Sequence, residues 1–223
     1  MTTALLFLSA IMVIAVGWLV RKTINVTPWV EQRPTEVVSG DGALSLLPVQ
    51  VGLGVFLAVA TSLFALLISA YHMRMAEADW TALALPRVLW LNTAILVLAS
   101  IAMQWTLVVT RQGRMAAVRK GLMASGVFSF AFLAGQVWAW QQLSVSGHFT
   151  AANPAYAFFV LLTTLHAIHL LGGLSVWARA TTRAVRGVEI GKVRLSVELC
   201  AVYWHFLLLV WAVLYAVLLQ TQR

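Results

Sequence analysis

Six long apolar stretches with almost no charge constrain this chain more than any other feature. They run roughly over residues 4–20, 48–71, 88–109, 121–143, 155–178 and 197–219. A bilayer core about 30 Å thick needs roughly 20 apolar residues per helix. Helices rather than barrel strands should satisfy the backbone of such continuous stretches in lipid. The sequence therefore predicts an all-α fold, a polytopic membrane helix bundle of about six transmembrane helices.

Composition agrees with a membrane protein. Hydrophobic residues make up 61% of the chain and charged residues 10%, and the mean hydropathy is +0.89, which is unlike a soluble domain. The formal net charge of +8 is expected to set topology and to attract anionic lipid headgroups. Nucleic acid is not an expected partner, because a soluble basic face is missing. Cys200 has no second cysteine to pair with and is expected to be a small buried hydrophobe.

The basic residues predict the orientation of the chain in the membrane. All of them except Arg74, Arg87 and Arg223 fall after the first, third or fifth apolar stretch. Because cytoplasmic loops collect Lys and Arg, both termini are expected on the outer side. No basic residue precedes the first stretch and Arg21 and Lys22 follow it, so it is interpreted as an uncleaved helix rather than a signal peptide.

Three segments are expected along the chain. Residues 1–22 form an N-terminal transmembrane helix, residues 23–47 a cytoplasmic linker loop rich in Pro, Gly and acidic residues, and residues 48–223 a five-helix transmembrane bundle. The other loops are expected to be roughly 10 to 18 residues long. No internal repeat and no pair of mid-membrane charges is found, so a small-solute transporter has little support.

Histidines inside the last two apolar stretches are the main candidates for a functional site. His166 and His169 are three residues apart and share one helical face, as do Glu198 and His205, seven residues apart. Since the two helices should run antiparallel, His169 and His205 are expected at similar depth and near each other, with Glu198 closer to the headgroups.

Four interpretations of this cluster compete. The histidines could be axial ligands of a b-type haem, part of a metal site with Glu198, or a proton relay. The favoured interpretation is structural, with imidazoles that hydrogen-bond between helices. Asn92 and Gln136 fit the same role as secondary polar bridges, and Gly172 and Gly173 should permit close backbone approach. No known catalytic motif occurs, so no catalytic residue is expected in this chain.

Several motifs carry a resemblance to a known family. The segments are LTTLHAIHLLGGL at Leu162–Leu174, VELCAVYWHF at Val197–Phe206, LWLNT at Leu89–Thr93 and GQVWAW at Gly135–Trp140. Together they resemble cytochrome c oxidase subunit III, the subunit III family of bacterial haem-copper respiratory oxidases. The resemblance covers roughly residues 48–220.

The resemblance implies an integral subunit of the bacterial inner membrane with no haem or copper of its own. The termini, expected on the outer side from the charges, would then be periplasmic. The resemblance also implies direct packing against oxidase subunit I, assembly with subunit II, and phospholipid bound in a cleft between the first two helices and the rest. Subunit I reduces oxygen to water and pumps protons in aerobic respiration, and subunit III supports its proton uptake and durable turnover. The electron donor is cytochrome c or, in a sister branch, quinol.

The motif positions are His166, His169, Gly172, Gly173, Glu198, Tyr203, Trp204 and His205, for which the resemblance implies structural or lipid-related roles and no metal ligation. The sequence departs from the family pattern in two places. Val59 and Ala60 stand where members often have an acidic residue, and Leu207 replaces a common aspartate. The alternatives are a quinol oxidase subunit III or a nitric oxide reductase accessory subunit, and, outside the family, an independent b-type haem electron carrier.

Overall fold

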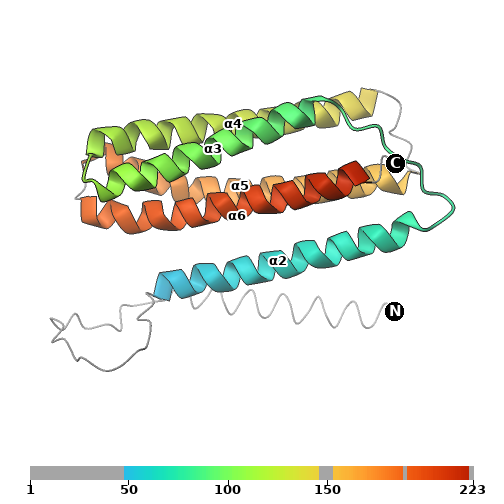
Figure 1. The fold of residues 1–223 in the computed structure, drawn as a ribbon, viewed down its shortest axis with the longest axis horizontal. Coiled ribbons are helices and arrows are strands. Elements are labelled where there is room, and N and C mark those ends of the chain that lie inside the picture. Colours follow the sequence, from blue (N-terminus) through green and yellow to red (C-terminus); the bar gives the residue numbers. More distant parts are fainter. Residues whose placement is uncertain (1–47, 146–152, 188–189, 221–223) are drawn as a thin grey trace. The chain divides into compact units, whose positions relative to one another are not determined.

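Five long α-helices make up the part of the chain that the computed structural model describes, residues 48–145, 153–187 and 190–220. They are α2 (Pro48–Met75), α3 (Val88–Arg111), α4 (Met115–Val145), α5 (Pro154–Val185) and α6 (Ile190–Gln220) (Figure 1). Each is long and apolar enough to cross a membrane, and these described residues include no strand. The five-helix block is therefore present as expected, whereas the predicted helix of residues 1–22 and linker of residues 23–47 lie outside the described residues.

The helices extend beyond the apolar stretches that mark them in the sequence. Helix α4 begins at Met115 rather than near residue 121, and α6 at Ile190 rather than near residue 197. The expectation of loops of roughly 10 to 18 residues was wrong at the α3–α4 turn, which comprises only residues 112–114. Hydropathy marks the part of a helix inside lipid, while charged but helix-favouring residues continue the helix into the headgroups. Gly113 closes this turn with a positive φ of 77°.

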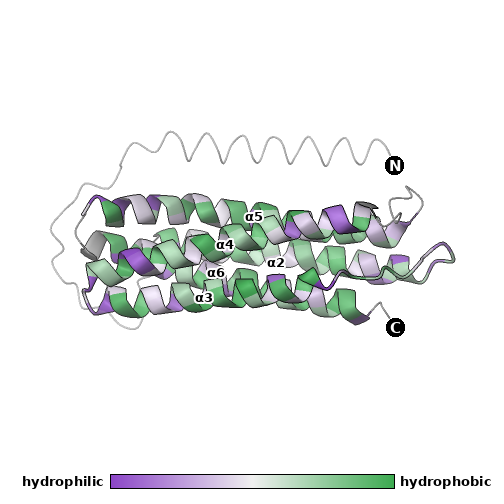
Figure 2. Ribbon diagram, turned by 90° about the horizontal axis from the view of Figure 1, so that it is seen from above, coloured by the Kyte–Doolittle hydropathy of each residue, from purple (hydrophilic) through white to green (hydrophobic). Residues whose placement is uncertain are grey.

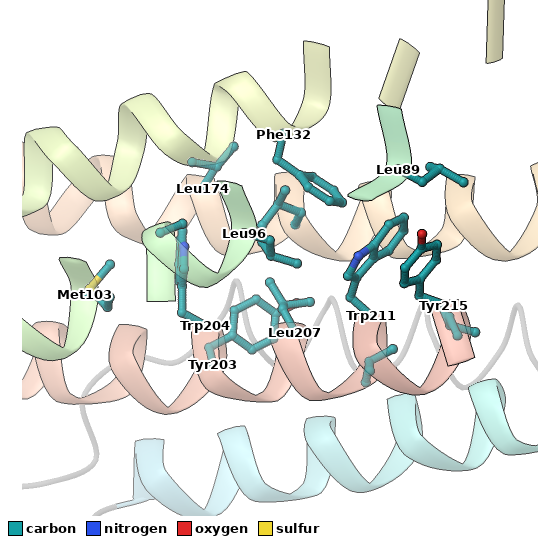
Figure 3. Close-up of a cluster of buried hydrophobic side chains, with 14 of the residues drawn as sticks. Leu89, Leu96, Met103, Phe132, Leu174, Tyr203, Trp204, Leu207, Trp211 and Tyr215 are labelled. Carbon is teal, nitrogen blue, oxygen red and sulfur yellow. The ribbon is translucent and has the colours of Figure 1, made fainter. Parts of the chain in front are cut away.

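Helices α3 to α6 pack around one core. Helix α3 contacts α4 and α6, and α5 contacts the same two helices from the other side. Large side chains fill the centre, among them Phe132 of α4 and Trp204, Leu207 and Trp211 of α6 (Figure 3). All four are at most 1% exposed, so these helices form a closed four-helix bundle.

Indole N–H groups hydrogen-bond between helices inside this bundle. Trp204 donates to Ser129 Oγ at 3.0 Å, which joins α6 to α4. Trp211 donates to Thr93 Oγ1 at 3.0 Å, which joins α6 to α3. Trp140 and Trp177 each make a similar bond between α4 and α5. Because lipid and apolar core offer no other acceptor, these bonds specify which helices are neighbours.

Helix α2 is attached differently from the others. Only 11% of an 18-residue apolar segment of α2 is buried, against 50% of the corresponding segment of α6. Helix α2 contacts α5 and α6. At its C-terminal end Tyr71 packs against Phe158 of α5 and against Trp80 of the loop that follows α2. Just beyond, Arg74 donates to the Asp79 carboxylate at 2.6 Å, which lowers the pKa of that carboxyl. Hydrophobic residues run along all the described helices (Figure 2), and many large ones are exposed, as expected in lipid.

Basic residues collect at one end of the bundle. The α3–α4 and α5–α6 turns lie at the same end as the start of α2 (Figure 1), and the residues near them include Arg111, Arg114, Arg119, Arg183 and Arg194. Arg119 also donates to the carbonyl of Ala184 at 2.9 Å, which ties the start of α4 to the end of α5. One of these basic residues therefore also satisfies a helix C-terminus.

We expect Trp204→Phe to lower the free energy of unfolding by about 1–3 kcal/mol, because the change leaves a cavity and removes a buried hydrogen bond. The matched control is Trp138→Phe, whose indole is 53% exposed and should change little. Denaturant unfolding of the purified chain in detergent measures both. Equal losses in the two variants would contradict the assigned role of the Trp204 bond.

Candidate functional site

The three histidines of α5 and α6 point to three different places. His166 lies inside the four-helix bundle, His169 faces α2, and His205 faces α3. His169 and His205, expected near each other from their depth, therefore bond and pack with different helices. Depth places residues along a helix axis, but side-chain direction around that axis decides which neighbours they touch.

His166 is enclosed by aromatic rings. Its side chain is 0% exposed, and its ring centroid lies 5.7 Å from that of Phe132 and 5.2 Å from that of Trp211. Neither ring nitrogen has a hydrogen-bond partner in the described part of the chain. A porphyrin on His166 would have to displace one of these aromatic side chains, so the geometry does not favour a haem ligand here.

His169 joins the bundle to α2. Its Nδ1–H donates to the carbonyl of Leu165 at 2.8 Å, while its ring packs against Phe64 and Phe56 of α2, with centroids 5.3 Å and 6.0 Å away. The hydroxyl of Tyr203 donates to the backbone carbonyl of His169 at 2.8 Å. The ring of His169 thus joins α5 to α2, and its backbone carbonyl joins α5 to α6.

His205 lies on the outer surface between α6 and α3. Its Nδ1 is 2.6 Å from Ser100 Oγ, and its Nε2 is 3.0 Å from Gln104 Oε1. The sequence interpretation named neither Ser100 nor Gln104 as a partner, because a residue on another helix leaves no signal at any fixed spacing from His205. Both ring nitrogens are occupied by side chains of α3, which leaves none for a metal.

Glu198 lies at the basic end of the bundle. Its carboxylate accepts a hydrogen bond from Arg194 at 3.0 Å and lies 3.8 Å from Arg111 of α3. It therefore belongs to an ion-pair group separate from the histidines. Within residues 48–145, 153–187 and 190–220, no three His, Cys, Asp or Glu side chains come together as metal ligands would. The metal interpretation consequently has no support from the geometry of these residues.

Asn92 and Gln136 meet in the bundle interior. The Asn92 amide donates to Gln136 Oε1 at 3.5 Å, and both side chains are buried. Gly135 permits this approach, because a Cβ at that position would overlap Asn92 Oδ1. The amides that the sequence suggested as bridges between helices do face each other across α3 and α4.

Gly172 and Gly173 have different surroundings although they are adjacent. A Cβ on Gly173 would lie 2.5 Å from the Tyr203 ring and 3.3 Å from that of Trp204, so only glycine lets α5 and α6 approach here. A Cβ on Gly172 would meet nothing within 4 Å. Gly173 therefore sets the packing of α5 on α6, and Gly172 borders open space.

That open space is an apolar cavity of about 390 Å³ between α2 and the α5–α6 pair. Its walls are Val49, Leu53, Phe56, Gly172, Gly173, Val176, Leu199, Cys200, Tyr203 and Trp204. A neighbouring cavity of about 250 Å³ shares Leu53 and Leu199 with it and is bordered by Glu198. An apolar space with charged groups at one end suits an amphiphile such as a phospholipid. The α2 wall was missed from the sequence because Val49, Leu53 and Phe56 look like any apolar helix residues.

Comparison with known proteins gives consistent matches. The family model described as cytochrome c oxidase subunit III matches residues 4–221. A protein of Nocardia farcinica named probable cytochrome c oxidase subunit 3 is 25% identical over 173 residues, 75% of this chain and 85% of that protein. The cytochrome c oxidase subunit 3 of Thermostichus vulcanus is 26% identical over 175 residues, 75% and 84% of the two chains. A cytochrome bo(3) ubiquinol oxidase subunit 3 of Buchnera aphidicola is 22% identical over 121 residues, 54% of this chain and 59% of that one.

We expect Gly173→Ala to destabilise the chain by about 1–3 kcal/mol, because the methyl group would force the Tyr203 ring away from α5. The adjacent Gly172→Ala should be neutral or slightly stabilising, since helical Ala is favoured over Gly by about 1 kcal/mol. Thermal unfolding of the two variants in the same detergent measures the difference. A destabilised Gly172→Ala would argue against open space at that position.

Proposed function

The chain belongs to the cytochrome c oxidase subunit III family, and from this premise we propose that it acts as a structural subunit of a bacterial haem-copper terminal oxidase. In this role it packs directly against the catalytic subunit I, with subunit II in the same complex, and supports oxygen reduction to water and proton pumping without catalysing either. The observation that carries the proposal is the family match over residues 4–221.

The surroundings of the histidines support a role without a cofactor in this chain. His169 and His205 use their side chains to join α5 to α2 and α6 to α3, and His166 is enclosed by Phe132 and Trp211. These contacts are what helix packing in lipid requires. Haem and copper then belong to the partner subunits, and an independent b-type haem carrier is not favoured.

A bound phospholipid is the second part of the proposal. The cavity between α2 and the α5–α6 pair has apolar walls, and Arg194 and Arg111 beside Glu198 lie at the end of the bundle where a headgroup would sit. An acyl chain in this space would cover the inner face of α2, which has little protein contact of its own. Lipid would thereby act as part of the packing between α2 and the bundle.

The orientation follows from the charges. The bundle end with Arg111, Arg114, Arg119, Arg183 and Arg194 would face the cytoplasm. The chain would then be a multi-pass protein of the bacterial inner membrane with both termini periplasmic.

The donor to the complex is taken to be cytochrome c, as in the names of the Nocardia and Thermostichus relatives. The Buchnera relative is named as a ubiquinol oxidase subunit, which keeps quinol as the second candidate. A subunit II with a copper site, recovered with this chain, would support cytochrome c.

We expect the tagged chain, purified from native membranes in mild detergent, to bring down a large haem-copper subunit. After the subunits are dissociated, all haem absorbance should follow that partner. The variant His166→Phe should leave haem per complex unchanged, because neither ring nitrogen has a partner in the described residues. Haem absorbance retained by this chain alone would overturn the proposal.

We expect Gly172→Phe to reduce the phospholipid that stays with the chain, because the ring would occupy the cavity beside α2. Gly52→Phe is the matched control, since a Cβ there also meets nothing within 4 Å but Gly52 does not line this cavity. Native mass spectrometry counts the retained lipids. Equal phospholipid content in both variants and the unaltered chain would contradict a lipid at this place.

A further inference from the structure

A groove on the outer surface of the bundle follows the seam between α3 and α6. It has a volume of about 480 Å³ and is lined by Val97, Ser100, Ile101, Gln104, Trp105, Val108, His205 and Leu208. Most of these side chains are apolar, and Ile101 and Trp105 are exposed. The groove differs from the cavity beside α2 because it contains a group of hydrogen-bonding side chains.

Those side chains form a short chain of hydrogen bonds. The Ser100 hydroxyl donates to His205 Nδ1 at 2.6 Å, and His205 Nε2–H then donates to Gln104 Oε1 at 3.0 Å. This arrangement uses the acceptor of the Gln104 amide and leaves its NH₂ group without a partner in the part of the chain that the structure describes. Gln104 is exposed and lines the groove.

The NH₂ group of Gln104 lies at a depth in the membrane where lipid offers no hydrogen-bond acceptor. Gln104 precedes Arg111, the last residue of α3, by two helical turns, which is roughly 10 Å along the helix axis. Acyl chains at that depth have no hydrogen-bonding atoms, and an unpaired polar group there is costly.

Three other exposed polar side chains avoid this cost by bonding to their own helix. Thr61 and Ser62 on α2 donate to the carbonyls of Leu57 and Ala58 at 2.7 Å and 3.0 Å. Ser175 on α5 likewise donates to the carbonyl of Gly172 at 2.7 Å. The Gln104 NH₂ has no such acceptor among the described residues, so it needs one from beyond them.

We propose that the α3–α6 groove is the docking site for a transmembrane helix of subunit I, and that this helix presents a hydrogen-bond acceptor to the Gln104 NH₂. The acceptor is a carboxylate, a hydroxyl or an amide oxygen on an otherwise apolar helix face, because the rest of the groove is apolar. This inference rests on the proposed function, which supplies the partner. It assigns one particular face of the bundle to the contact.

The first test exchanges the donor for an acceptor. Gln104→Glu keeps an oxygen for His205 but removes both N–H donors, and it places an acceptor opposite the acceptor of the partner helix. The matched control is Gln141→Glu, the same change at an exposed position of α4. Hydrogen bonds between membrane helices contribute about 0.6–1.7 kcal/mol, so Gln104→Glu should weaken association with subunit I roughly 3- to 20-fold.

The readout is the fraction of subunit I that keeps this chain through a detergent titration of the purified complex. Loss in Gln104→Glu with retention in Gln141→Glu supports the docking face. Equal retention in the two variants overturns it.

The second test does not depend on a polar substitution that could disturb folding. A photo-crosslinking amino acid replaces Ile101 in the groove or Val127 on α4, which are both exposed, and native membranes are irradiated. An adduct of subunit I at Ile101 and none at Val127 is the expected result. An adduct with lipid only, or with subunit I only from Val127, overturns the docking face even where the complex purifies intact. Failure to co-purify with any haem-copper subunit would instead overturn the proposed function, and this inference with it.

Discussion

Lipid offers no hydrogen-bonding partners, and the arrangement of this bundle depends on that constraint. Each buried indole N–H must find an acceptor on a neighbouring helix. Trp204 and Trp211 therefore reach from α6 to α4 and α3, and Trp140 and Trp177 join α4 and α5. Apolar side chains alone would pack almost as well in several helix arrangements. An indole N–H donor, by contrast, meets its acceptor only in the arrangement that places that acceptor beside it. The tryptophans thus supply specificity where hydrophobicity is the same inside and outside.

Helix α2 is less buried than the four helices of the bundle. It meets α5 and α6 through the aromatic contacts of Phe56, Phe64 and Tyr71, and a cavity remains beside Gly172. A helix held by a few rings leaves space that a flexible apolar molecule can fill. The bundle and α2 therefore suit different roles: the closely packed bundle suits a scaffold, and the space beside α2 suits a lipid.

The sequence was sufficient for much of the fold, and it named candidate site residues whose function stays a prediction. Hydropathy located all five described helices, since about 20 apolar residues with no charge have few alternatives to a transmembrane helix. It misplaced the ends of α4 and α6 because helix continues into the headgroup region, where hydropathy no longer marks it. The motif around His166, His169 and His205 was recognised, but the three rings were not separated, because their directions depend on which faces of α5 and α6 are covered.

Sequence by itself determined that the chain is a multi-pass membrane protein and which polar residues lie inside its apolar stretches. These follow from transfer free energies, which depend on residue type alone. Only the tertiary structure decided which residues are partners. His205 hydrogen-bonds to Ser100 and Gln104. Gly173 packs against Tyr203, while a Cβ on Gly172 would meet nothing within 4 Å. Those outcomes depend on the rotation of each helix about its axis and on contacts between residues far apart in the chain. A linear pattern does not contain that rotation, because every helix packs against faces supplied by the others.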